Sequence, residues 1–166
     1  MGRGLPTVVI VFALFSAGCG EQNESDTTAS ETTGATMTRG EVIAAGDAAC
    51  TEYRRKATPL VDQLRNSSDH GERAGLLRQL ASAAEPSVQR LATVLPPPDG
   101  RQALDDYVLL GGEQIVVVRR AADQLDEGDE ASAWALLGSA LENVAKLRGL
   151  AEGYGFKVCG SELDGS

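Results

Sequence analysis

The sequence has little of the chemistry on which most enzymes depend. It has one histidine, His70, and one tryptophan among 166 residues, and its three cysteines lie far apart. It lacks the C-x-x-C, H-E-x-x-H and G-x-S-x-G patterns and a phosphate-binding glycine loop, which excludes the common metal, redox, hydrolase and nucleotide sites. We expect no metal, no cofactor and no catalytic residue. His70, in the polar stretch 66–71, is expected to lie on the surface because no nearby spacing supplies partners for a base or ligand.

Positive charge is also scarce. The sequence has 15 Lys and Arg against 24 Asp and Glu, which gives a net charge of −9. This negative charge argues against nucleic acid as a partner and against docking on anionic lipid headgroups. We interpret the acidic pairs Asp105-Asp106, Asp126-Glu127 and Asp129-Glu130 as solvated faces and helix caps. The basic clusters Arg54-Arg55-Lys56 and Arg119-Arg120 are expected to form ion pairs with neighbouring helices.

The N-terminus reads as an export signal. Residues 1–18 contain one arginine, an apolar run too short to span a bilayer, and small residues at the end, as in a secretory signal peptide. Ser16-Ala17-Gly18-Cys19 is similar to the lipobox in which a cysteine takes a diacylglyceryl group, although Ser16 replaces the usual leucine. Residues 19–39 then form a lipidated cysteine and a disordered Ser/Thr-rich tether. Ordinary cleavage, giving a secreted protein, is the alternative.

Residues 40–160 have the size of one domain, followed by a flexible tail at 161–166. Four segments repeat apolar residues with a helical period, which predicts an all-α, up-down four-helix bundle. The expected N-terminal caps are listed here: Thr38 with Glu41 as a capping box, Asp69, Asp99 and Asp129. Pro59 and Pro86 predict kinks or restarted helices, with Thr58 as a cap at the first, and Gly153 and Gly155 are expected to end the fourth helix.

One stretch permits two interpretations. Residues 107–118 place Gly111-Gly112 between two β-prone runs, as in a hairpin. The helical apolar stripe nevertheless continues in phase through both glycines, so we predict a helix. Close packing against a neighbouring helix would explain why glycine stands there.

Cys50 and Cys159 are predicted to form a disulfide. The up-down topology places the end of the fourth helix beside the start of the first, and the export signal implies an oxidising compartment. Two buried thiols, or a metal or redox role, are the alternatives.

The lipobox-like Cys19, the Ser/Thr-rich tether, the Ala-rich helices, the cysteine in the first helix and the terminal Val158-Cys159-Gly160 resemble small actinobacterial secreted or lipid-anchored helical proteins. The resemblance covers most of the chain, and it implies a helical fold at the outer side of the cell membrane. It implies no activity and adds no catalytic residue.

Two function classes follow. The first is a membrane-anchored, non-enzymatic interaction module of the cell envelope, which binds another envelope protein through a helix face. The second is a carrier that holds a small molecule or lipid inside the bundle. Tyr107 and Trp134 lie at or beside core-facing positions and are the candidate ligand-facing residues, whereas Tyr154 and Phe156 belong to the closing tail.

Overall fold

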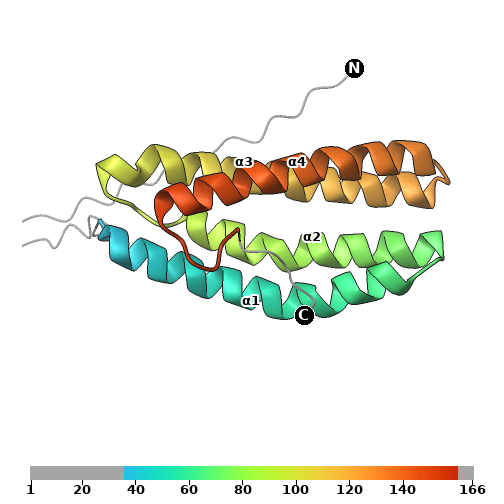
Figure 1. The fold of residues 1–166 in the computed structure, drawn as a ribbon, viewed down its shortest axis with the longest axis horizontal. Coiled ribbons are helices and arrows are strands. Elements are labelled where there is room, and N and C mark those ends of the chain that lie inside the picture. The colour runs from blue at the N-terminus through green and yellow to red at the C-terminus, as the bar shows by residue number, and fades with distance from the viewer. Residues whose placement is uncertain (1–35, 161–166) are drawn as a thin grey trace, which may run out of the picture. The chain divides into compact units, whose positions relative to one another are not determined.

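The computed structural model describes residues 36–160, and these form an up-down bundle of four antiparallel helices (Figure 1). The helices are α1 (Arg39–Asn66), α2 (His70–Ala92), α3 (Pro98–Asp126) and α4 (Glu130–Tyr154). The predicted all-α class and bundle are therefore confirmed. The predicted signal peptide, Cys19, most of the predicted tether and the predicted tail at 161–166 lie outside the described residues. No described helix is long and apolar enough to cross a membrane.

Three of the predicted caps begin the helices as expected. Thr38 and Glu41 form the capping box of α1, with the Thr38 amide donating to Glu41 Oε2 over 2.7 Å. Asp69 and Asp129 accept from backbone amides in the first turns of α2 and α4. Each cap satisfies an amide that has no partner within its helix, which contributes about 1 kcal/mol.

The cap predicted at Asp99 is wrong. The observed cap is Pro97, two residues earlier, so α3 begins at Pro98, and the extended Pro97 makes no side-chain hydrogen bond. Proline is suited to this first turn because its fixed φ is helical and its missing amide proton would have no partner there. Asp99 instead lies within the first turn, where its negative charge interacts favourably with the positive end of the helix dipole.

The prolines inside α1 and α2 do not divide them. Pro59 and Pro86 lie within continuous helices, so the expectation of a restarted helix is wrong. Thr58 is not a cap either, because its hydroxyl donates to the Arg54 carbonyl one turn earlier, over 2.9 Å. α1 does bend near its middle (Figure 1). The missing amide and the ring of Pro59 are the physical reason for a bend in that part of the helix.

Residues 107–118 are helical throughout, which excludes the hairpin. A Cβ at position 111 would lie 3.1 Å from Val88 Cγ2, so Gly111 does mark a close approach of α3 to α2. The same explanation fails for Gly112, since no described atom lies within 4 Å of a Cβ built there.

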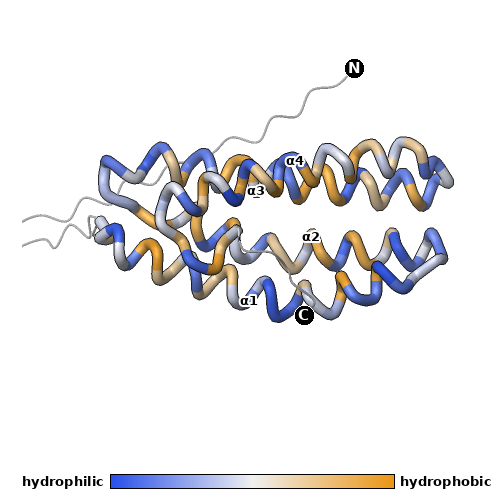
Figure 2. The backbone as a smooth tube through the Cα atoms, viewed as in Figure 1, coloured by the Kyte–Doolittle hydropathy of each residue, from blue (hydrophilic) through white to orange (hydrophobic). Residues whose placement is uncertain are grey.

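The helices pack in chain order: α1 on α2, α2 on α3 and α3 on α4. α1 and α4, which would adjoin in a fully closed bundle, do not pack along their lengths. Apolar residues recur along every helix among hydrophilic ones (Figure 2), and the buried residues gather in two clusters. The disulfide-end cluster comprises Val42, Cys50, Leu91, Leu104, Ala151, Tyr154, Phe156 and Cys159. The far-end cluster comprises Ala74, Leu77, Ala121, Ala122, Leu125 and Ala133.

The aromatic residues are distributed differently from our expectation. Tyr154 and Phe156 are core residues, exposed by 1% and 4%, with ring centroids 4.9 Å apart. Tyr154 closes α4 and Gly155 follows in the left-handed conformation at φ 105°, so Gly155 ends the helix and Gly153 does not. Trp134 is 52% exposed, so it lies beside the core and not within it. The neighbouring Ala133 occupies the buried position of the far-end cluster.

Candidate functional site

A groove opens where α1 and α4 fail to pack. It encloses about 790 Å³ and is lined by all four helices and by the tail at 158–160. The disulfide-end cluster and the far-end cluster lie on either side of it along the bundle. A volume of this size is within the range of small-molecule sites.

The wall of the groove is mainly aliphatic. Its large apolar side chains come from all four helices and include Val61, Val88, Leu91, Ile115, Leu141, Val144 and Leu147. Leu141 and Val144 on α4 are 72% and 40% exposed, so they form an apolar edge that faces solvent. Covering this edge would be favourable at about 25 cal/mol for each Å² of apolar surface.

The C-terminal tail seals one end of the groove. The disulfide between Cys50 and Cys159, predicted from the sequence, is present with Cα atoms 5.2 Å apart. The carboxylate of Asp47 accepts from the backbone amides of Lys157 and Val158 at 2.9 and 2.8 Å. These bonds fix the tail against α1, so the groove has one closed end.

The same end is tied to α4 by two arginines. Arg39 at the start of α1 donates to the Tyr154 carbonyl at 2.8 Å, which satisfies an acceptor at the C-terminus of α4. Arg148 on α4 donates from Nε to the Gly160 carbonyl at 3.0 Å. The guanidinium of Arg148 is therefore positioned beside the disulfide and forms part of the groove lining.

Two tyrosines add polar atoms near the closed end. Burial raises the pKa of Tyr107 to about 12, with smaller contributions from Tyr53 and Asp47, and burial also raises the pKa of Tyr53. The Tyr107 hydroxyl lies 3.9 Å from Cys50 Sγ. Because both tyrosines stay protonated at neutral pH, they can donate hydrogen bonds but cannot act as bases.

Gln114 presents a polar atom without a partner. Its side-chain carbonyl oxygen is buried and accepts no hydrogen bond from the described residues, while the residue lines the groove. A buried acceptor without a donor costs about 1–3 kcal/mol. A ligand or water that donates a hydrogen bond at this point of the groove would remove that cost.

Three arginines, Arg54, Arg65 and Arg148, line the groove. Arg65 pairs with Asp62 on its own helix over 3.6 Å, and Arg148 is held by the Gly160 carbonyl. At least two of the three guanidinium groups are therefore engaged within the protein.

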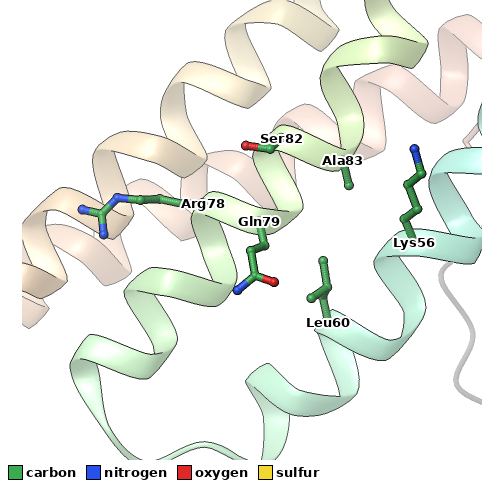
Figure 3. Close-up of a pocket in the computed structure, with 6 residues that line it drawn as sticks. All are labelled: Lys56, Leu60, Arg78, Gln79, Ser82 and Ala83. Atoms are coloured by element: carbon green, nitrogen blue, oxygen red, sulfur yellow. The ribbon is translucent and has the colours of Figure 1, made fainter.

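A second hollow lies on the surface between α1 and α2 and is smaller, at about 440 Å³ (Figure 3). Its cations already have partners: Lys56 pairs with Glu52 at 2.9 Å, and Arg78 points away from the hollow (Figure 3) and pairs with Asp123 at 2.8 Å. The rest of its lining consists of Leu60, Gln79, Ser82 and Ala83. We find no arrangement there that would recognise a ligand.

The candidate residues from the sequence have different outcomes. Tyr107, one of the two candidate ligand-facing residues, lines the groove. Trp134 lines neither hollow and instead has the Arg73 guanidinium 5.8 Å from its ring centroid. His70 is exposed, as predicted, and pairs with Glu130. Within residues 36–160, no group of His, Cys, Asp and Glu is arranged to hold a metal ion.

Other residues fulfil sequence predictions outside the groove. Arg119 forms the expected ion pair with a neighbouring helix, contacting Glu85 at 2.7 Å. Asp126 pairs with Arg78 at 2.6 Å on the surface, which agrees with its interpretation as part of a solvated face.

Sequence reasoning missed the groove residues Arg54, Arg148 and Gln114 as a set. Arg54 lies one turn after Cys50 on the same face of α1, and this spacing is the one signal that could have placed it beside the disulfide. Nothing in the sequence marks Gln114 or Arg148. Comparison of the chain with known protein families, with characterised proteins and with solved structures gives no match, so its function has to be inferred from this geometry.

Proposed function

We propose that this protein is a membrane-anchored, non-enzymatic binding protein of the cell envelope that holds a small apolar or lipid ligand in its groove. One observation carries the proposal: the four helices leave an apolar groove of about 790 Å³ with a buried, unpartnered Gln114 oxygen in its wall. A bundle whose core is filled and whose polar groups are paired would offer no such site.

Binding rather than catalysis is supported by the chemistry of the lining. The described lining contains no histidine, aspartate or glutamate, and its two cysteines form the disulfide. The raised pKa values of Tyr53 and Tyr107 leave these residues as hydrogen-bond donors. The groove therefore offers shape, apolar surface and polar recognition, without an evident nucleophile or base.

The anchor is supported by the sequence. The export signal at 1–18 and the lipobox-like junction at Cys19 would place the domain on the extracytoplasmic face, joined by its Ser/Thr-rich tether. Replacing Cys19 tests this part separately. If Cys19→Ser moves the protein from the detergent phase to the aqueous phase, lipidation at Cys19 is supported, whereas continued partition into detergent contradicts it.

Occupation of the groove can be tested with a matched pair of variants. Ala84 lines the groove, whereas its neighbour Ala83 on α2 faces the hollow between α1 and α2. The Cys19→Ser chain should copurify with a small molecule that native mass spectrometry detects. Ala84→Phe should abolish this ligand by filling the groove, and Ala83→Phe should retain it. A Cys19→Ser chain that copurifies with no small molecule, and from which no single-chain amphiphile displaces an environment-sensitive dye, would exclude the carrier function.

The interaction module is the second candidate. Leu109 and Val116 on α3 are 64% and 47% exposed and lie seven residues apart, on one face of the helix. Two exposed apolar side chains are common on monomeric proteins, so this face supports the candidate less than the groove supports a carrier. Cross-linking in the native envelope, with Leu109→Lys as the variant, tests it. Loss of a single enriched partner in the variant would favour this function.

A further inference from the structure

We propose that the ligand of the groove is an uncharged amphiphile whose polar group donates a hydrogen bond, as a hydroxyl or an amide N–H does, to the side-chain oxygen of Gln114. This inference rests on the proposed function and gives its ligand a chemical class. Three observations lead to it: a buried acceptor without a donor, arginines that already have partners, and apolar surface around the acceptor.

Gln114 brings to the groove an acceptor that needs a donor. Its side-chain oxygen is buried and accepts no hydrogen bond from the described residues. Among these residues, the Tyr154 hydroxyl is the other buried side-chain atom without a partner, and it does not line the groove. An amide oxygen can only accept, so a ligand pairs with it by donating. An ether or ester would leave it unpaired, and the site therefore discriminates between ligands by their donor.

The charged residues of the lining favour an uncharged ligand. Arg65 pairs with Asp62 over 3.6 Å. Arg148 donates to the Gly160 carbonyl over 3.0 Å, and Arg54 also has a partner within the protein. None of the described lining residues is an aspartate or a glutamate, so a cation would find no carboxylate. A charge that leaves water without gaining a partner costs far more free energy than a neutral polar group does.

The surroundings of Gln114 are apolar. On α3 it stands seven residues, about 10 Å, beyond Tyr107, whose hydroxyl lies 3.9 Å from Cys50 Sγ. Between the two, α3 contributes Gly111 to the lining, and Val88 of α2 packs closely against this glycine. A ligand that donates to Gln114 therefore has aliphatic wall beside its polar group, and the rest of the ligand is hydrocarbon.

The test compares two isomers, decanol and nonyl methyl ether, on the Cys19→Ser chain. Both contain the same atoms, but only the alcohol has an O–H to donate. Each competes with a neutral, environment-sensitive dye at concentrations below its solubility limit. We expect decanol to bind about fivefold or more tightly than the ether, because the ether leaves the buried acceptor without a donor. Burial of apolar surface alone predicts the opposite order, since the ether is the more hydrophobic isomer.

Decanoate and decylammonium extend the comparison to charge. At neutral pH one is an anion and the other a cation, and both keep a ten-carbon chain. We expect each to bind at least about fivefold more weakly than decanol, because neither finds an unpartnered opposite charge in the lining. A charged probe that binds as tightly as decanol, or more tightly, would contradict the uncharged class.

Variants then locate the hydrogen bond. Gln114→Met keeps the length of the side chain and removes its acceptor, so decanol should bind about fivefold more weakly and the ether at least as tightly as before. Gln102→Met is the matched control, since Gln102 is exposed on the same helix, bonds to Asp106 and lies outside the groove. Circular dichroism confirms that each variant is folded. If Gln114→Met still prefers decanol to the ether, the assignment to Gln114 is wrong.

The outcomes separate this inference from the proposed function. If decanol has no advantage over the ether on the unmutated groove, the hydrogen-bond donor is wrong while a carrier function stands. If none of the four probes binds and no ligand copurifies, the carrier function itself fails. The comparison of the isomers needs no variant of the groove, so a misfolded variant does not prevent a decision.

Discussion

The two ends of the bundle are closed by different means. At the disulfide end, the large side chains of Tyr154, Phe156 and Leu104 pack with the tail between α1 and α4. At the far end, alanines and leucines of α2, α3 and α4 pack together, and α1 contributes Leu64 from the edge. Small residues let α2, α3 and α4 approach one another closely, but nothing among the described residues ties α1 to α4 there. Tail residues 158–160 line the groove, so the packing of this segment against α1 closes one of its ends.

Removing the disulfide should cause the largest loss of stability, and this loss should be centred on the disulfide end. The bond joins residues 109 positions apart, and closing a loop of this length stabilises a fold by up to about 4.7 kcal/mol in the chain-entropy model. We expect Cys50→Ser with Cys159→Ser, in a Cys19→Ser background, to lower the free energy of urea unfolding by about 4 kcal/mol. Amide hydrogen exchange should accelerate most at the start of α1 and the end of α4. A loss below about 1 kcal/mol would show that packing alone closes this end.

A truncation of the aromatic pair tests the packing without touching the disulfide. Phe156→Ala removes a ring that is 4% exposed and should cost about 3–4 kcal/mol, as large-to-small core substitutions do. Trp134→Ala is the control, because that side chain is 52% exposed and should cost less than about 1 kcal/mol. Thermal and urea unfolding measure both. Equal losses would mean that the two aromatic positions contribute alike, against the structure.

Two glycines inside helices should respond in opposite directions to alanine. A Cβ at Gly46 would overlap the buried ring of Phe156, so Gly46→Ala should destabilise the protein by about 1–3 kcal/mol. Gly112 has no described atom within 4 Å of a Cβ, so Gly112→Ala should stabilise it by about 0.5–1 kcal/mol through helix propensity. The free energies of urea unfolding of the two variants, each compared with the unmutated chain, test this difference in sign. A gain in stability for Gly46→Ala would contradict the close contact between α1 and the tail.

The smallest expected effect is a change of stability with pH, and it is confined to alkaline pH. Burial raises the pKa of Tyr107 from 10.0 to about 12, and it also raises the pKa values of Tyr53 and Tyr154. The folded state thus holds these protons more tightly than the unfolded chain does. The resulting stability is complete below pH 10 and is lost as the pH rises through about 12. Tyrosinate absorbance should therefore appear at higher pH in the native protein than in urea, and Tyr107→Phe should reduce the difference. If the tyrosines titrated at the same pH in the native protein and in urea, burial of these side chains at the disulfide end would be contradicted.

Much of the fold could be predicted because its signals are local. The helical period marked four helices, and the carboxylates and hydroxyl of Asp69, Asp129 and Thr38 were identified as caps because a cap bonds only within its own first turn. The errors also have local explanations. Asp99 is a common capping residue, but α3 begins at Pro98. Pro59 predicts an interruption from its local chemistry, but α1 continues through it.

The groove could not be predicted in the same way. Arg54, Gln114 and Arg148 belong to three different helices, and they line one site only because the helices pack in chain order without closing between α1 and α4. Trp134 was predicted at or beside a core-facing position because it is in phase with apolar neighbours. The structure buries the adjacent Ala133 and leaves the indole 52% exposed, a choice between neighbouring positions that periodicity does not specify.

The sequence by itself determined the helical class, the number of helices and the pairing of Cys50 with Cys159, because periodicity and up-down topology leave few alternatives. Only the tertiary structure decided which residues are core, which face solvent, and where the bundle stays open. These outcomes depend on the volumes of side chains that meet across helices, from Phe156 against Gly46 to Val88 against Gly111. Close packing is a property of pairs of distant residues, so it appears only when the chain has folded.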